Sequence, residues 1–312
     1  MKFLFYSGKL FISCRQPKNV DALSHALIAY ILFSVPPLAP LIPFAVLGAV
    51  LPDADIFFSA IADRNPSLYL FTHGGGAHSI AGSVLLSTVG YGTVLLITAA
   101  GNVPSAVIAS AGVSGFAAVI AGGFLHIAID VLACPGIPLL VPFSDRKFTL
   151  GILPGPSLFL AFCALGAVAV TVLRLLPFSS ALLLYGGMVI AVIALRAGMF
   201  LVADAKLTGR KVPSINPLRW LVIREDKATI SVQRYTFFSG FSGEAVFEKY
   251  RNTDGRELSL VEDLPEVRRF LFHAYCMTAE RIGSVLILAD PVREKGYLYY
   301  PPKYKRIAVP AE

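Results

Sequence analysis

A long stretch that is nearly free of charge constrains the fold of this chain more than any other feature. Residues 20–205 hold few Lys, Arg, Asp or Glu, whereas residues 206–312 carry most of them. The chain as a whole is 15% charged, against about 25% in soluble domains. We therefore predict an all-α polytopic membrane domain over residues 21–205, followed by a small soluble C-terminal domain over residues 206–312.

Apolar runs divide the membrane domain into about six helical segments. They cover residues 21–35, 41–52, 77–100, 106–133, 157–176 and 180–203. The first two segments are separated by P-P-L-A-P, and each is shorter than the ~20 residues that a full span needs. Residues 1–20 have no long apolar core or small-residue cleavage site, so we interpret them as a basic leader or an over-extended start.

The C-terminal region has the pattern of an α+β or mostly-β domain. Alternating β-branched and aromatic residues predict strands in L-V-I-R, A-T-I-S-V-Q-R-Y-T-F-F and A-V-F-E-K-Y. Residues 261–277 predict an amphipathic helix that begins with acidic residues. G-S-V-L-I-L-A-D and K-G-Y-L-Y-Y predict two further strands.

The net charge of +7 is better explained by basic residues in cytoplasmic loops than by binding to nucleic acid. We do not expect nucleic acid as a partner. If the helices are followed in order, most Lys and Arg residues of the loops, and the whole C-terminal domain, lie on one side. The positive-inside rule makes that side cytoplasmic. The four cysteines form no C-x-x-C pair and fit neither a disulfide framework nor a zinc knuckle. The oligomeric state is left open.

The unusual polar residues of the membrane domain all fall at or near this same side. The candidate metal ligands are His25, Asp53, Asp55, His73, His78, His126 and Asp130. His126 and Asp130 are four residues apart in an apolar helix, so they share one face, and ionisable groups in such a helix tend to be functional.

The chemistry of the candidate ligands points to a divalent metal. Asp53 and Asp55 end the second segment, and the G-G-G between His73 and His78 permits a tight loop. Mixed imidazole and carboxylate donors suit zinc most, with manganese or iron as alternatives. Seven ligands are enough for one or two ions. Taken singly, each motif also has a simpler explanation as a helix end or a solvated loop, and His273 is interpreted as structural.

The motifs resemble one known family. D-A-L-S-H-A-L, G-A-V-L-P-D-A-D, H-G-G-G-A-H-S and F-L-H-I-A-I-D-V-L are similar to those of the YdjM-type, LexA-regulated membrane-bound metal-dependent hydrolases. The resemblance covers about residues 20–220. It implies that Asp21 and His25 together form the first of the family's motifs. Two departures are Gly74, where the family has arginine, and Ala77, where it has threonine. An arginine at the first position could hold an anionic substrate.

Taken together, residues and resemblance predict a hydrolase of the cytoplasmic (inner) membrane. The predicted substrate is a phosphoester or lipid-linked compound at the cytoplasmic face, and the lipid bilayer is the expected partner. Asp53 or Asp55 would act as general base toward water activated by the metal. The alternatives are a cation or metal transporter and a metal-binding membrane scaffold.

Overall fold

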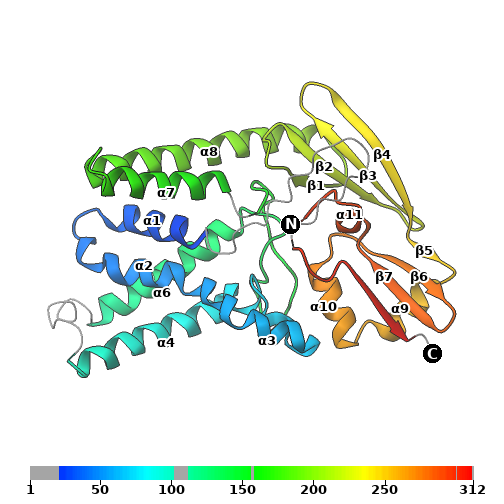
Figure 1. The fold of residues 1–312 in the computed structure, drawn as a ribbon, viewed down its shortest axis with the longest axis horizontal. Helices are drawn as coiled ribbons and strands as arrows, with labels where there is room; N and C mark the ends of the chain where they lie inside the picture. The colour runs from blue at the N-terminus through cyan, green and yellow to red at the C-terminus, as the bar shows by residue number, and fades with distance from the viewer. Residues whose placement is uncertain (1–20, 102–111, 156–157, 300, 311–312) are drawn as a thin grey trace.

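A computed structural model describes residues 21–101, 112–155, 158–299 and 301–310. Residues 1–20, which we interpret as a leader, lie outside this described part. The helices run side by side toward a β domain, with residues 131–155 between the two parts (Figure 1). The chain thus has a helical N-terminal region followed by a C-terminal β-sheet region, in the order that the sequence predicts.

The helical region contains seven described α-helices and four short 3-10 turns. The α-helices are α1 (Asp21–Phe33), α2 (Ile42–Val50), α3 (Ser59–Arg64), α4 (Ile80–Ala99), α6 (Gly112–Asp130), α7 (Leu158–Val172) and α8 (Phe178–Lys206). The turns are η1 (Ala39–Leu41), η2 (Pro52–Phe57), η3 (Pro66–Phe71) and η4 (Gly76–His78).

Four helical stretches in the described residues are long and apolar enough to cross a membrane. They are Ala39–Arg64, Ile80–Ala99, Gly112–Asp130 and Phe178–Lys206. The apolar helices Ala22–Phe33 and Phe159–Val172 are shorter. The predicted set of six helical segments is therefore not confirmed as six spans, because two of them fall short of the length that a span needs.

Helices α2 and α6 pack at the centre of this region through glycines. A Cβ atom at Gly48 would lie 1.9 Å from the Val119 carbonyl oxygen, and one at Gly122 would lie 2.0 Å from the Ala45 carbonyl oxygen. Only glycine permits backbones to approach this closely, as in the small-residue interfaces of membrane helices. This approach sets the position of the C-terminal end of α2 against α6.

In its described residues, the β domain contains two four-stranded sheets. The first is an antiparallel meander of β1 (Arg210–Pro213), β2 (Arg219–Glu225), β3 (Thr229–Thr236) and β4 (Gly240–Glu248). The second joins β5 (Tyr250–Arg251), β6 (Thr278–Ile282), β7 (Val285–Ala289) and β8 (Arg306–Pro310), with only β5 and β6 parallel. Three helices complete the domain: α9 (Gly255–Val261), α10 (Pro265–His273) and α11 (Pro291–Glu294).

Two predicted elements of this domain differ from the structure: one strand is absent from the described residues, and one helix is shorter than predicted. Residues 295–299 form no strand, because Gly296 has a φ of +74° and the amides of Tyr297 and Leu298 fold back to the Val292 carbonyl after α11. The strand of this region is β8 instead. The helix predicted over 261–277 covers only Pro265–His273, since proline starts it and Ala274 is extended.

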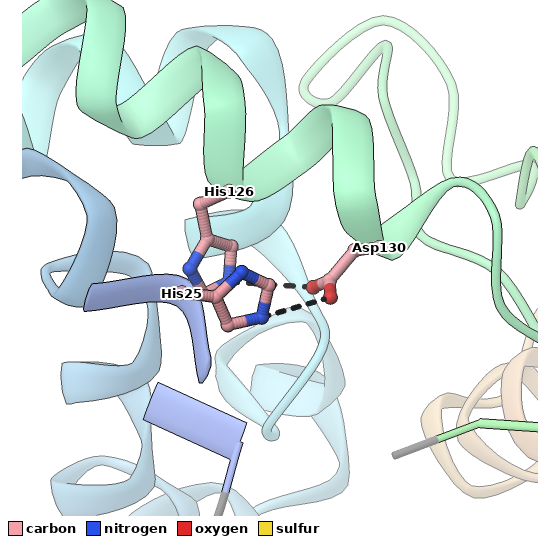
Figure 2. A group of neighbouring side chains, drawn as sticks. All are labelled: His25, His126 and Asp130. Carbon is pink, nitrogen blue, oxygen red and sulfur yellow. Dashed lines mark ion pairs between the residues drawn. The ribbon is translucent and has the colours of Figure 1, made fainter. Parts of the chain in front are cut away.

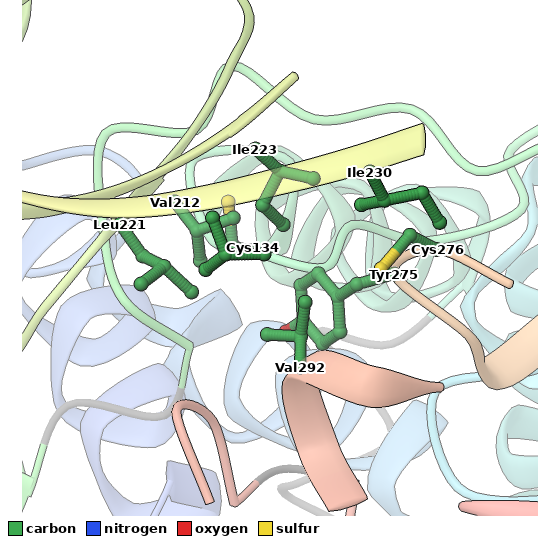
Figure 3. Packing of buried hydrophobic residues seen from close by; sticks show 9 residues of the cluster. Cys134, Val212, Leu221, Ile223, Ile230, Tyr275, Cys276 and Val292 are labelled. Atoms are coloured by element: carbon green, nitrogen blue, oxygen red, sulfur yellow. The ribbon is translucent and has the colours of Figure 1, made fainter. Parts of the chain in front are cut away.

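The β domain is attached to the helical region through buried contacts. Cys134, which follows α6, packs in one apolar cluster with Val212 and Ile223 of the first sheet and with Tyr275 and Val292 (Figure 3). Further clusters bury the second sheet against α10 and the end of α8 against the first sheet.

Polar and aromatic contacts add to this attachment. Lys303 and Tyr304 bind the Asp63 carboxylate of α3. Tyr69 of η3 packs edge-to-face on Phe272 of α10. The domain therefore covers the end of the helical region from which Asp130 emerges.

Candidate metal centre

All seven candidate ligands predicted from the sequence meet at the end of the helical region that faces the β domain. Their donor atoms form three overlapping groups, each within 4.8 Å: His25–His126–Asp130, Asp53–His78–His126 and Asp55–His73–His78. They come from α1, η2, the loop before α4, and the end of α6. The side chain of Asp21, the eighth residue of the resemblance, lies outside the described part.

Asp130 is the carboxylate that joins three histidines. Its Oδ2 lies 3.3 Å from His126 Nε2 and 3.4 Å from His78 Nε2, and its Oδ1 lies 3.4 Å from His25 Nε2. The rings of His25 and His126 stack with centroids 3.9 Å apart, and both face the Asp130 carboxylate (Figure 2). The predicted i, i+4 pairing of His126 and Asp130 is thus present on α6.

The orientation of the His126 ring is fixed by a hydrogen bond on the side of the ring away from Asp130. Its Nδ1 lies 2.7 Å from the carbonyl oxygen of Ala49, in the last turn of α2. A carbonyl oxygen only accepts, so Nδ1 carries a proton and donates it. With Nδ1 donating, Nε2 is the ring atom left for a ligand, and this fully buried atom makes no hydrogen bond among the described residues. It faces the carboxylates of Asp130 and, at 3.8 Å, Asp53.

Asp55 holds the two histidines of the glycine loop. Its Oδ1 lies 2.7 Å from His73 Nδ1, and its Oδ2 lies 3.1 Å from His78 Nδ1 and accepts from the Gly74 amide at 3.0 Å. Asp55 is 3% exposed. A carboxylate behind a histidine is a common support for a metal ligand, because it orients the ring and leaves Nε2 for the ion. His78 Nε2 then faces Asp53 Oδ1 at 3.6 Å.

The glycines of H-G-G-G-A-H are required by the shape of this loop. Gly74 has a φ of +75°, a conformation that side chains with a Cβ rarely adopt. A Cβ at Gly75 would lie 2.2 Å from the Leu70 carbonyl oxygen. Ser79 then caps α4 by accepting from the Gly82 amide and donating to the Gly76 carbonyl. The loop therefore turns both imidazoles inward, as the sequence predicts.

The donor set fits one or two divalent cations. With neutral imidazoles, the three carboxylates would place a net negative charge at the end of an apolar helical region. Such charge is costly unless it is offset. The His126 lone pair also points at carboxylate oxygens, which repel it unless a cation or a proton lies between them. Nitrogen and oxygen donors in this mixture are typical of zinc, manganese and iron sites.

The centre opens on one side through two of its carboxylates. Asp53 and Asp130 are 17% and 19% exposed and line a cavity of about 70 Å³ together with His73, Lys147 and His273. His25, His78 and His126 are buried. The sequence predicts a structural role for His273 and no role in the site for Lys147, because no local motif indicates that α10 folds back onto the membrane domain.

Comparison with known families identifies the family of the helical region. A family model described as YdjM inner membrane protein matches residues 20–204, so the chain belongs to this family, as the resemblance predicts. The match includes all seven candidate ligands and ends before the β domain. No curated protein and no solved structure matches the chain.

Proposed function

We propose that this member of the YdjM inner membrane protein family is a metal-dependent hydrolase that acts on a phosphoester or lipid-linked substrate at the cytoplasmic face of the membrane. The observation that carries the proposal is the arrangement of His126. Its Nδ1 is held by the Ala49 carbonyl, and its buried Nε2 faces Asp53 and Asp130, which border an open cavity. Catalytic metal sites keep such an open side, whereas structural sites are closed.

Four side chains form the best set of ligands in this proposal. His78 and His126 offer their Nε2 atoms, while Asp53 offers Oδ1 and Asp130 offers Oδ2. His25 Nε2 approaches the other oxygen of Asp130 and would extend the set to a second ion. A bound divalent metal supplies a Lewis acid that activates water and stabilises negative charge on a substrate oxygen.

The two acidic residues of L-P-D-A-D take different roles in this proposal. Both oxygens of Asp55 are engaged with His73, His78 and the Gly74 amide, so Asp55 acts by positioning the imidazoles. Asp53 borders the cavity, and its Oδ2 makes no hydrogen bond among the described residues. Asp53 is therefore the better candidate for the general base, as an alternative to its role as a ligand.

The location of the polar groups favours an enzyme over a transporter. A path for ions needs polar groups through the depth of the membrane, but the described histidines and acidic residues of the helical region gather at the end that carries the β domain. Lys and Arg residues also concentrate there, which supports a cytoplasmic position for this end. A substrate that reaches a site at this level is expected to be amphipathic.

The test measures metal content and hydrolysis on the purified full chain in detergent. We expect bound zinc, manganese or iron by elemental analysis, and cleavage of a short-chain phospholipid that a chelator abolishes and added metal restores. His126→Ala should lose both. Asp204→Asn is the matched control, since Asp204 pairs with Lys211 on the surface of α8. Activity that survives chelation or the His126→Ala change would contradict the proposal.

A further inference from the structure

We propose that a basic cavity between the segment 131–155 and the β domain binds a phosphate group of the substrate beside the metal centre. The cavity has a volume of about 410 Å³, and its charged wall residues are Asp145, Arg146, Lys147, Arg210 and Arg268. The inference rests on the proposed function and adds to it a substrate-binding role for the β domain.

The basic cavity adjoins the opening of the metal centre. The two cavities share Pro135, Lys147 and His273 as wall residues. Lys147 and His273 therefore stand where the small cavity, with Asp53 and Asp130, meets the larger one. A phosphate group that contacts Lys147 would lie at the junction with the cavity that Asp53 and Asp130 line.

The charge of the basic cavity is unbalanced. Its walls carry four cationic side chains and one acidic side chain. The acidic one, Asp145, accepts a hydrogen bond at 2.7 Å from the Tyr69 hydroxyl. Among the described residues, no carboxylate forms an ion pair with Arg146, Lys147 or Arg210, and Arg268 pairs with Asp263. Arginine and lysine in this arrangement are typical of phosphate recognition.

Lys147 is the centre of this unbalanced charge. It is half-buried, and its Nζ lies 4.0 Å above the Phe272 ring of α10. Burial, together with Arg293 of α11 and Arg210 of β1, lowers the pKa of Lys147 to about 7, while Asp145 acts in the opposite sense. Burial and the neighbouring arginines make the charged form of this ammonium group unfavourable. A bound anion therefore stabilises it more than it would stabilise an ammonium group that already has a carboxylate partner.

His273 contributes an uncharged imidazole ring to the wall of the basic cavity and adds no positive charge. Burial, followed by the charges of Lys147, Arg293 and Arg269, holds the pKa of His273 well below its ordinary value. Its ring stacks on Tyr304, and its Nε2 lies 3.4 Å from the Thr72 hydroxyl, which donates to the Tyr69 carbonyl. His273 is thus fixed between the glycine loop and the β domain, at the junction of the two cavities.

About half of the wall of the basic cavity comes from the part of the chain that the family match does not cover. Arg210, Arg268 and His273 lie beyond residue 204, where the match ends. The metal centre is thus made by the matched region, whereas recognition of the anionic group depends on how the β domain docks. The substrate class that fits is a phosphate-bearing amphiphile, whose phosphate enters the basic cavity from the level of the membrane surface.

Binding measurements on the full chain in detergent test this inference without relying on catalysis. Isothermal titration calorimetry with inorganic phosphate is carried out with and without zinc. Removing one charge-assisted contact should weaken binding by about tenfold or more, so Lys147→Met is expected to do so in both metal states while keeping the metal content of the wild type. Lys227→Met, on an exposed turn after β2, is the control and should bind as the wild type does.

Further arms identify the source of the phosphate and separate the two proposals. Dihexanoyl phosphatidic acid that binds more tightly than inorganic phosphate, with no binding of dihexanoylglycerol, would assign the cavity to a lipid headgroup; equal or weaker binding would assign it to a soluble phosphate compound.

His126→Ala should lose metal yet keep phosphate binding. Unchanged binding in Lys147→Met, or binding that disappears with the metal, would overturn the inference even if hydrolysis were found. Phosphate binding without any hydrolysis would support it and contradict the proposed reaction.

Discussion

Replacing Gly48 of α2 by alanine should damage the metal centre, although Gly48 offers no ligand. The new Cβ would lie 1.9 Å from the Val119 carbonyl oxygen, 2.8 Å from the Val119 carbonyl carbon and 3.0 Å from the Gly123 amide nitrogen. All three atoms belong to the backbone of α6, so no side-chain rotation can relieve the contact. The two helices must move apart at this point.

The size of this movement decides the effect on His126. Ordinary contact begins at 3.4 Å, so the helices must separate by about 1.5 Å, an overpacking that costs about 1–3 kcal/mol. Ala49, the next residue, accepts the 2.7 Å hydrogen bond from His126 Nδ1, and a bond of that length does not survive such a shift. Loss of a support behind a metal-binding histidine lowers metal affinity by about 10–100-fold.

The assay compares Gly48→Ala with Gly92→Ala, which lies in α4 with open space around the added Cβ. Both changes give the same gain in helix propensity, about 1 kcal/mol, so the difference between them isolates the helix contact. We expect a lower unfolding temperature in detergent and weaker zinc binding by competition with a chromophoric chelator for Gly48→Ala alone. A Gly48→Ala protein with the zinc affinity and unfolding temperature of Gly92→Ala would refute the reasoning.

Three further changes test separate parts of the structure. Asp290→Asn should destabilise the β domain by about 3–5 kcal/mol in chemical unfolding, because it leaves the fully buried Arg293 without its carboxylate, 2.7 Å away. Asp130→Asn should reduce bound metal in elemental analysis more than Asp55→Asn does, since Asp130 faces the Nε2 atoms of His25, His78 and His126, whereas Asp55 contacts the Nδ1 atoms of His73 and His78 from behind; equal losses would contradict the assigned roles. Sulfate, whose charge is constant over this range, should bind most tightly below pH 7 and more weakly as pH rises above 7, because Lys147 loses its proton there; calorimetry on Lys147→Met should show this slope removed.

The helical region and its seven candidate ligands could be predicted because each signal is local. The i, i+4 spacing of His126 and Asp130 places both on one face of any helix, and ionisable residues in an apolar run are conspicuous. L-P-D-A-D and H-G-G-G-A-H mark the ends of helical segments, so following the chain through the membrane brought them to the same side. The number of full spans does not follow from the sequence, since short apolar helices satisfy the same hydropathy pattern without the necessary length.

The β domain could be predicted only in outline, because its details depend on contacts that are distant in sequence. K-G-Y-L-Y-Y has the composition of a strand, but Gly296 and the fold-back onto Val292 prevent its described residues, 295–299, from pairing as a strand. The position of His273 depends on Tyr304, on Thr72 and on the docking of α10 against η3. No periodicity within α10 contains this information.

The support behind His126 shows why a complete set of ligands does not by itself define this site. The last turn of any helix leaves carbonyl groups without partners, and α2 uses that of Ala49 to fix the tautomer of a histidine on another helix. The contact exists only because Gly48 and Gly122 allow the two backbones to approach. A relative could therefore keep all seven histidines and aspartates and still bind metal poorly if a larger residue separated α2 from α6. For chains of this kind, the glycines at the helix crossing therefore belong to the candidate site together with the ligand motifs.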